Sequence, residues 1–175
     1  GSWARYDKAM YSWRTGSTQL LSDRGMRFGS NCFHIGIIAI LGGHFVGLLT
    51  PHALYEPFIT SSQKQLLAMV VGGFFGALCF VGITILLVRR LTNARVRAIG
   101  SFGDTLVLVL LFAQLCLGLY SIKVSAGHLD GGVMVMLAEW AQHIVTFRAG
   151  AADYVEGVHW VYKAHIFLGL TLRSE

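Results

Sequence analysis

The chain has 175 residues, of which 54% are hydrophobic and only 13% are charged, and its mean hydropathy is +0.59. Charged residues make up about a quarter of an ordinary water-soluble domain, so this composition excludes such a domain. The formal net charge of +5 fits either an anionic partner or a membrane topology, and the positions of the basic residues decide between the two.

Three apolar runs are long enough to cross a bilayer, for which about 20 residues suffice. They cover residues 28–49, 66–88 and 105–122 and contain no Asp, Glu, Lys or Arg. A fourth apolar run begins at Val158 and stops at Arg173, which is too short to span comfortably. We expect an all-α membrane bundle with three complete spans and a truncated fourth.

The basic residues cluster on two segments. One is the N-terminal segment before the first span, and the other is the 89–102 loop, which carries four arginines and no acidic residue. Positive charge stays on the cytoplasmic side of membrane proteins, so both segments are expected inside, and the 50–65 and 123–157 loops outside. Because these charges flank spans, we predict no nucleic-acid partner.

Apolar residues recur every three or four positions within the 123–157 loop, at Val133, Leu137, Trp140, Ile144 and Phe147. This period is typical of an amphipathic helix. We expect a short helix that lies on the outer membrane surface.

Histidines interrupt the apolar runs at two depths. A helix rises about 1.5 Å per residue, so His44, five residues before Leu49, lies about 8 Å below the outer surface. His165, seven residues after Val158, lies about 10 Å deep by the same rise. His34 is much deeper, at about 22 Å.

Two imidazoles that reach one depth from separate helices predict an axial pair on a haem iron. Polar groups inside a membrane are costly and usually mark a function. Zinc is less favoured because its sites usually collect three or four ligands, often with Cys or carboxylates. Small residues beside the histidines would make room for a flat macrocycle: Gly36, Gly42, Gly43, Gly47 and Gly169. Haems at two depths would form an electron path, as in a quinol-oxidising cytochrome b.

Other interpretations remain open on the residues alone. One is a quinone-linked cytochrome b of a sulfite-type or heterodisulfide-type oxidoreductase, and another is a bare membrane anchor. A third is a transporter or proton channel with a histidine relay. Transporters often contain helices broken near the midplane, whereas no proline interrupts an apolar run here.

Several motifs resemble the gamma subunit of respiratory nitrate reductase, a dihaem membrane cytochrome b. They are spread over nearly the whole chain and read "GSWARYD", "YSWR", "FHIGI", "GHFVGLLTPH", "RRL", "RVRA", "EWAQ", "VTF" and "HIFLGLTL". The resemblance implies a five-helix protein, and residues 1–175 would be a single cytochrome b domain that lacks the first helix and the end of the last.

The resemblance also implies which residues bind haem b. His44 and His165 would be the axial ligands of an outer haem, and His34 would be a ligand of an inner haem whose second ligand lies beyond this chain. Possible contacts of the haem propionates are Arg89, Arg90 and Tyr6.

The remaining implications concern substrate and partners. Lys64 and Gly43 would form the site that oxidises menaquinol or ubiquinol. Electrons would pass to an iron–sulfur beta subunit and a molybdenum alpha subunit, which reduces nitrate in anaerobic respiration. Arg95 and Arg97 would help to dock these partners. The protein would reside in the bacterial cytoplasmic (inner) membrane, in contact with lipid.

Overall fold

A computed structural model describes residues 24–173, and this part of the chain is helical without a β-strand. Three helices are long and apolar enough to cross a membrane: α2 (Arg24–Leu49), α4 (Ser61–Thr92) and α6 (Phe102–Ser125). The shorter helices are α3 (His52–Tyr55), α5 (Ala94–Ile99), α7 (Gly132–Val145), α8 (Asp153–Glu156) and α9 (Trp160–Arg173). The expected all-α membrane bundle is confirmed.

Helices α4 and α6 begin before their apolar runs because polar residues cap their first turns. Thr60 Oγ1 accepts a hydrogen bond from the Gln63 amide (3.3 Å), and Gln63 Oε1 accepts one from the Thr60 amide (3.0 Å). Ser101 and Asp104 form the same reciprocal pair at the start of α6. Such capping boxes satisfy amide groups that the first turn leaves free, so both helices begin before their uncharged stretch.

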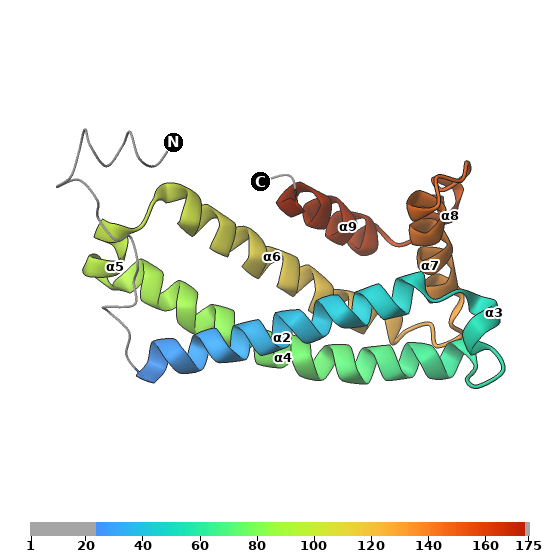
Figure 1. The fold of residues 1–175 in the computed structure, drawn as a ribbon, viewed down its shortest axis with the longest axis horizontal. Helices are drawn as coiled ribbons and strands as arrows, with labels where there is room; N and C mark the ends of the chain where they lie inside the picture. Colours follow the sequence, from blue (N-terminus) through green and yellow to red (C-terminus); the bar gives the residue numbers. More distant parts are fainter. Residues whose placement is uncertain (1–23, 174–175) are drawn as a thin grey trace, which may run out of the picture.

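Helices α2 and α4 pack backbone against backbone through glycine (Figure 1). A Cβ atom at Gly82 would lie 2.6 Å from the Gly29 carbonyl oxygen, and one at Gly36 would lie 2.8 Å from Cys79 Cα. Small residues permit such close approach between membrane helices, where lipid removes the hydrophobic drive for association. This contact fixes α2, and with it the two histidines that α2 carries.

Helix α7 closes the end of α2, while α9 packs along α6 (Figure 1). The buried Ala138 and Ala141 let α7 approach closely. Gln142 Nε2 donates to the Leu48 carbonyl oxygen (3.0 Å), which is one of the carbonyls that a helix end leaves without a partner. The last turn of α2 is thereby held in place.

The predicted helix in the 123–157 loop is present as α7, and it ends before Phe147, the last residue of the predicted apolar pattern. The most buried positions of α7 are the small residues Ala138 and Ala141. Ile144 is 50% exposed, and Phe147 lies beyond the helix end, with φ of +55° and an exposure of 97%. Its position on a membrane surface stays a prediction.

Gln65 ties the start of α4 to the turn between α6 and α7. Its side chain is 1% exposed. Nε2 donates to Ser125 Oγ (2.9 Å) and to the His128 carbonyl (2.8 Å), and Oε1 accepts from the Gly131 amide (2.8 Å). Gly131 has φ of +79°, a conformation that favours glycine. Both the amide nitrogen and the amide oxygen of Gln65 therefore have hydrogen-bond partners, which hold the first turn of α4 and the neighbouring residue, Lys64, in position.

We predict that Gly82→Ala destabilises the protein by about 1–3 kcal/mol, because the added methyl group must push α2 and α4 apart. The measurement is thermal unfolding of the protein in detergent. Gly72→Ala is the matched control in the same helix, since its Cβ would meet nothing within 4 Å. Equal melting temperatures for the two variants would contradict the close packing.

A second prediction concerns Gln65→Leu, which leaves the buried Gly131 amide without an acceptor. The loss of this acceptor is expected to lower the free energy of unfolding by about 2 kcal/mol or more. Faster hydrogen exchange of the Gly131 amide would report it. Ser62→Ala, at an exposed neighbouring position, should leave that exchange unchanged; the account fails if both variants exchange like the parent protein.

Candidate functional site

The imidazole rings of His44 and His165 face each other across the bundle. Their centroids are 6.1 Å apart and their planes are inclined by 35°. His44 precedes the last residue of α2, Leu49, by five positions, and His165 follows the first residue of α9, Trp160, by five positions. The depth calculation therefore selected two residues that the fold brings together.

A backbone carbonyl orients each histidine of α2. His44 Nδ1 lies 2.8 Å from the Ile40 oxygen, and His34 Nδ1 lies 2.7 Å from the Ser30 oxygen. A carbonyl can only accept, so both rings carry their proton on Nδ1. Nε2 then keeps a free lone pair, which is the form of imidazole that binds metals. Both side chains are exposed in the isolated chain.

His165 is half-buried and only partly satisfied. The Gln114 side-chain amide donates to the His165 carbonyl oxygen (3.0 Å) and lies 3.4 Å from His165 Nε2. His165 Nδ1 is buried and has no hydrogen-bond partner among the described residues, and the same holds for Gln114 Oε1. Buried polar atoms without a partner are destabilising. The site therefore contains two polar atoms that could bind a further group.

The glycines beside the histidines fall into two groups. Cβ atoms would meet nothing within 4 Å at three of them: Gly42, Gly43 and Gly47. Gly36 instead packs against Cys79, and a Cβ at Gly169 would lie 3.0 Å from Gln114 Nε2. The expectation that all five make room for a macrocycle is wrong for Gly36, whose absent side chain serves the α2–α4 contact.

Lys64 lies at the same end of the bundle as His44, because α3 joins the end of α2 to the start of α4 (Figure 1). Its side chain is only 9% exposed. Nζ is 3.8 Å from the centre of the Tyr55 ring, a distance typical of a cation–π contact. No hydrogen-bond acceptor for Nζ is present within residues 24–173. The ammonium group is thus held by an aromatic face and keeps its donors available.

Arg90 is engaged by protein groups at the opposite end of the bundle. Its Nη2 donates to Asp104 Oδ2 and to the Ser101 carbonyl oxygen, and its Nε donates to Thr105 Oγ1. All three distances are 3.0 Å. These contacts join α4 to the start of α6. Any further anion at Arg90 would share the guanidinium with Asp104.

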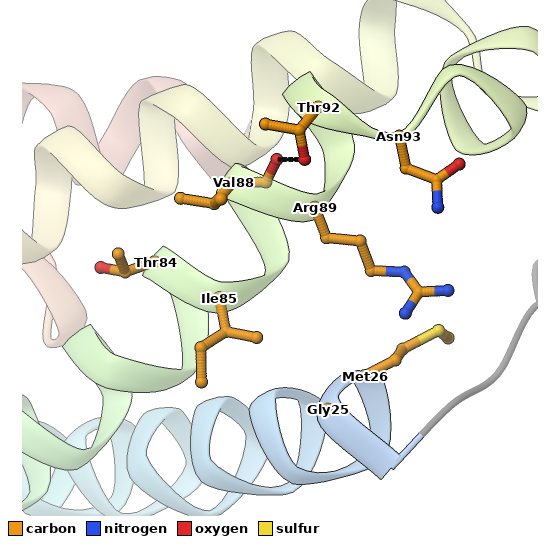
Figure 2. A pocket seen from close by; sticks show the side chains of 8 residues that line it. All are labelled: Gly25, Met26, Thr84, Ile85, Val88, Arg89, Thr92 and Asn93. Atoms are coloured by element: carbon orange, nitrogen blue, oxygen red, sulfur yellow. Dashed lines mark hydrogen bonds between the residues drawn. The ribbon is translucent and has the colours of Figure 1, made fainter.

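Arg89 lines a cavity of about 430 Å³ between the start of α2 and the end of α4. Figure 2 shows its side chain extending from α4 toward Met26 of α2. The cavity lies far from the His44–His165 pair, since its walls come from the opposite ends of the same helices. Tyr6 lies outside the described residues.

Sequence reasoning missed two residues of this site. Gln114 is the only amide side chain within the third apolar run, a signal that could have identified it. Tyr55 carried no such signal, because its contact with Lys64 depends on how the short helix α3 folds back.

Comparisons with known proteins find relatives that are similar over nearly the whole chain. The chain is 48% identical over 172 residues to the respiratory nitrate reductase 1 gamma chain of Escherichia coli K12, covering 98% of this chain and 76% of the relative. The respiratory nitrate reductase 2 gamma chain of the same organism matches with the same identity and coverage. A nitrate reductase gamma chain of Bacillus subtilis is 30% identical over 166 residues, covering 94% and 74%.

The sequence pattern of one protein family, described as nitrate reductase gamma subunit, matches residues 1–174. Both findings extend over nearly the whole chain, including the segments that carry His34, His44 and His165. The chain belongs to the nitrate reductase gamma subunit family and is a membrane subunit of a respiratory nitrate reductase.

Proposed function

We propose that the chain binds haem b between His44 and His165 and passes electrons from quinol through the membrane to the other subunits of the reductase. The observation that carries this proposal is the pair of facing imidazoles on separate helices, 6.1 Å apart. This separation leaves room for one metal ion between the rings, since a bond from a metal to an imidazole nitrogen is about 2 Å long.

The donor set fits haem iron. His44 and His165 would supply two nitrogen ligands to the iron, and no third His, Cys, Asp or Glu side chain joins them within residues 24–173. The orphaned Nδ1 of His165 and the exposed ring of His44 supply polar atoms with unused bonding capacity. The open space beside Gly42, Gly43 and Gly47 accommodates a flat group.

The chain's own residues would set the properties of this site. When bound, haem b supplies a one-electron acceptor whose potential depends on its axial ligands and surroundings. The Ile40 carbonyl holds the proton of His44 on Nδ1, and hydrogen bonding of that kind fixes the ring orientation and raises ligand basicity. Gln114 holds the backbone of His165 from α6.

Lys64 would bind the quinol oxygen. Its ammonium group is desolvated, faces the Tyr55 ring and has unused donors, so a hydrogen bond to an oxygen with developing negative charge would be strong. Gly43, next to His44, would let the quinol ring approach because no side chain intervenes. The substrate would be menaquinol or ubiquinol.

His34 would be a ligand of a second, inner haem b, since its Nδ1 proton is directed to Ser30 and its Nε2 is free. Fifteen residues separate it from Leu49, and the equivalent distance along α9 from Trp160 ends at position 175, outside the described residues. Arg89, Arg90 and Tyr6 are the proposed propionate contacts. Of these, Arg90 would keep its bond to Asp104.

We infer the topology from the charge pattern, and the partners from the resemblance to other gamma subunits. Residues 1–175 would form one domain in the bacterial inner membrane, with the 89–102 loop in the cytoplasm and the 50–65 and 123–157 loops outside. The exposed Arg95 and Arg97 would face an iron–sulfur subunit, from which electrons reach a molybdenum subunit. Quinol oxidation, rather than nitrate reduction, would be this chain's part of the reaction.

We predict that His44→Ala or His165→Ala in the complete reductase removes one bis-imidazole haem from the reduced-minus-oxidised spectrum. Quinol-dependent nitrate reduction should stop, because that haem is the proposed first electron acceptor. His128→Ala, at an exposed histidine of the 123–157 loop, should keep both haems. A His44→Ala protein with the full spectrum would refute the ligand assignment.

We predict that Lys64→Met weakens binding of a quinone-analogue inhibitor by about tenfold to a hundredfold, as expected for a lost charge-assisted hydrogen bond. The haem spectrum should not change. Lys123→Met is the matched control, since Lys123 lies near the same end of the bundle and is exposed. Unchanged inhibitor affinity in Lys64→Met would remove Lys64 from the site.

A further inference from the structure

Two hydrogen-bond contacts and one ion-pair contact connect Tyr55, beside Lys64, to a carboxylate at the surface. Tyr55 Oη lies 3.4 Å from Ser61 Oγ, Ser61 Oγ lies 3.2 Å from His52 Nε2, and His52 Nδ1 lies 3.4 Å from Glu56 Oε2. Together Tyr55, Ser61, His52 and Glu56 form a continuous chain, here called the α3 chain. None of these side chains has a role in the proposed haem or quinol sites except the Tyr55 ring.

The chemistry of the four groups gives the α3 chain a direction. A carboxylate only accepts hydrogen bonds, so His52 presents its Nδ1 proton to Glu56. His52 Nε2 is then an acceptor, and the Ser61 hydroxyl donates to it. The oxygen of Ser61 remains able to accept from the Tyr55 hydroxyl. Every donor thus points from Tyr55 toward Glu56.

Exposure increases in the same direction. Lys64, against the face of Tyr55, is 9% exposed. The His52 side chain is 38% exposed, and that of Glu56 is 66% exposed. The α3 chain therefore begins beside a buried cation without a hydrogen-bond partner and ends in contact with water.

We propose that the α3 chain conducts the protons of quinol oxidation from the Lys64 site to the outside, an inference that rests on the proposed quinol site. Oxidation of one quinol to quinone releases two electrons and two protons. The electrons would be accepted one at a time by the haem that His44 and His165 would hold. Each proton passes from a quinol hydroxyl to Tyr55 while the Tyr55 proton moves to Ser61, the Ser61 proton to His52 Nε2, and the His52 Nδ1 proton to Glu56 and water.

A second histidine cluster at this end of the bundle is less suitable. His143 of α7 lies 3.9 Å from Glu139, and its ring nitrogens face Tyr154 Oη (3.5 Å) and the Ala149 carbonyl (3.1 Å). These partners belong to α7, α8 and the turn between them, whereas the α3 chain starts at the residue that covers Lys64.

The test uses three variants of the complete nitrate reductase, with quinol-driven haem reduction followed by stopped-flow absorbance. His52→Ala interrupts the chain, and Tyr55→Phe removes its first hydroxyl but keeps the ring against Lys64. Ser61→Ala removes one small hydroxyl and carries little risk of misfolding. Each variant should slow haem reduction by at least about tenfold and increase its solvent isotope effect, because proton transfer becomes limiting.

Two further measurements separate proton conduction from structural damage. Added imidazole should restore the rate of His52→Ala and leave Ser61→Ala slow, since it replaces only the lost base. All three variants should keep the haem spectrum and the affinity for a quinone-analogue inhibitor. His128→Ala is the matched control and should behave like the parent protein.

The outcomes distinguish the two proposals. Normal rates and isotope effects in His52→Ala and Ser61→Ala, with active parent enzyme, would overturn the α3 chain and leave the quinol site intact. Slow rates together with lost inhibitor affinity would also overturn it, because the defect would then be in binding. A parent enzyme whose haems are not reduced by quinol would overturn the proposed function and the α3 chain with it.

Discussion

The structure depends on the absence of water from the bilayer core, where polar groups cannot be hydrated. Within the hydrocarbon region each backbone amide and carbonyl must be satisfied inside its own helix, which is why the three spans are unbroken over their apolar runs. Polar side chains at that depth then need a specific partner. His44 and His34 use the backbone carbonyl four residues earlier, and His165 meets Gln114.

The same constraint explains how the helices associate. Lipid offers apolar side chains as good an environment as another helix does, so close backbone contact and polar contacts carry the packing. Gly29, Gly36 and Gly82 provide the first kind between α2 and α4. Gln65 and Arg90 provide the second at opposite ends of α4, toward the α6–α7 turn and toward the start of α6.

Position along a helix could be predicted from the sequence, whereas rotation around the helix axis could not. The rise per residue placed His44 and His165 at one level, and the rings do face each other. The contacts of Arg90 with Asp104 and of Lys64 with Tyr55 depend on which way a side chain points and on how short connections turn. Arg90 and Asp104 are separated by α5, and Tyr55 and Lys64 by the turn after α3. Neither segment has an apolar pattern from which the direction of these side chains could be predicted.

Helix α7 was predicted from its period, whereas the positions it buries were not. The prediction used large apolar residues, of which Ile144 and Phe147 are exposed, and the most buried residues of α7 are the small Ala138 and Ala141. In a membrane protein the tightest contacts form where side chains are smallest. The apolar period therefore locates the helix, and its alanines mark where it packs most closely.

The hydrogen bond from Gln142 to the end of α2 links α7 to the histidine pair. His44 is little more than one helical turn from the capped Leu48 carbonyl, so fraying of that terminus would reach the imidazole almost at once. The side chain of Gln142 thus limits how far the imidazole of His44 can shift. A change in the position of α7, caused by a lipid or a bound protein, would misalign His44.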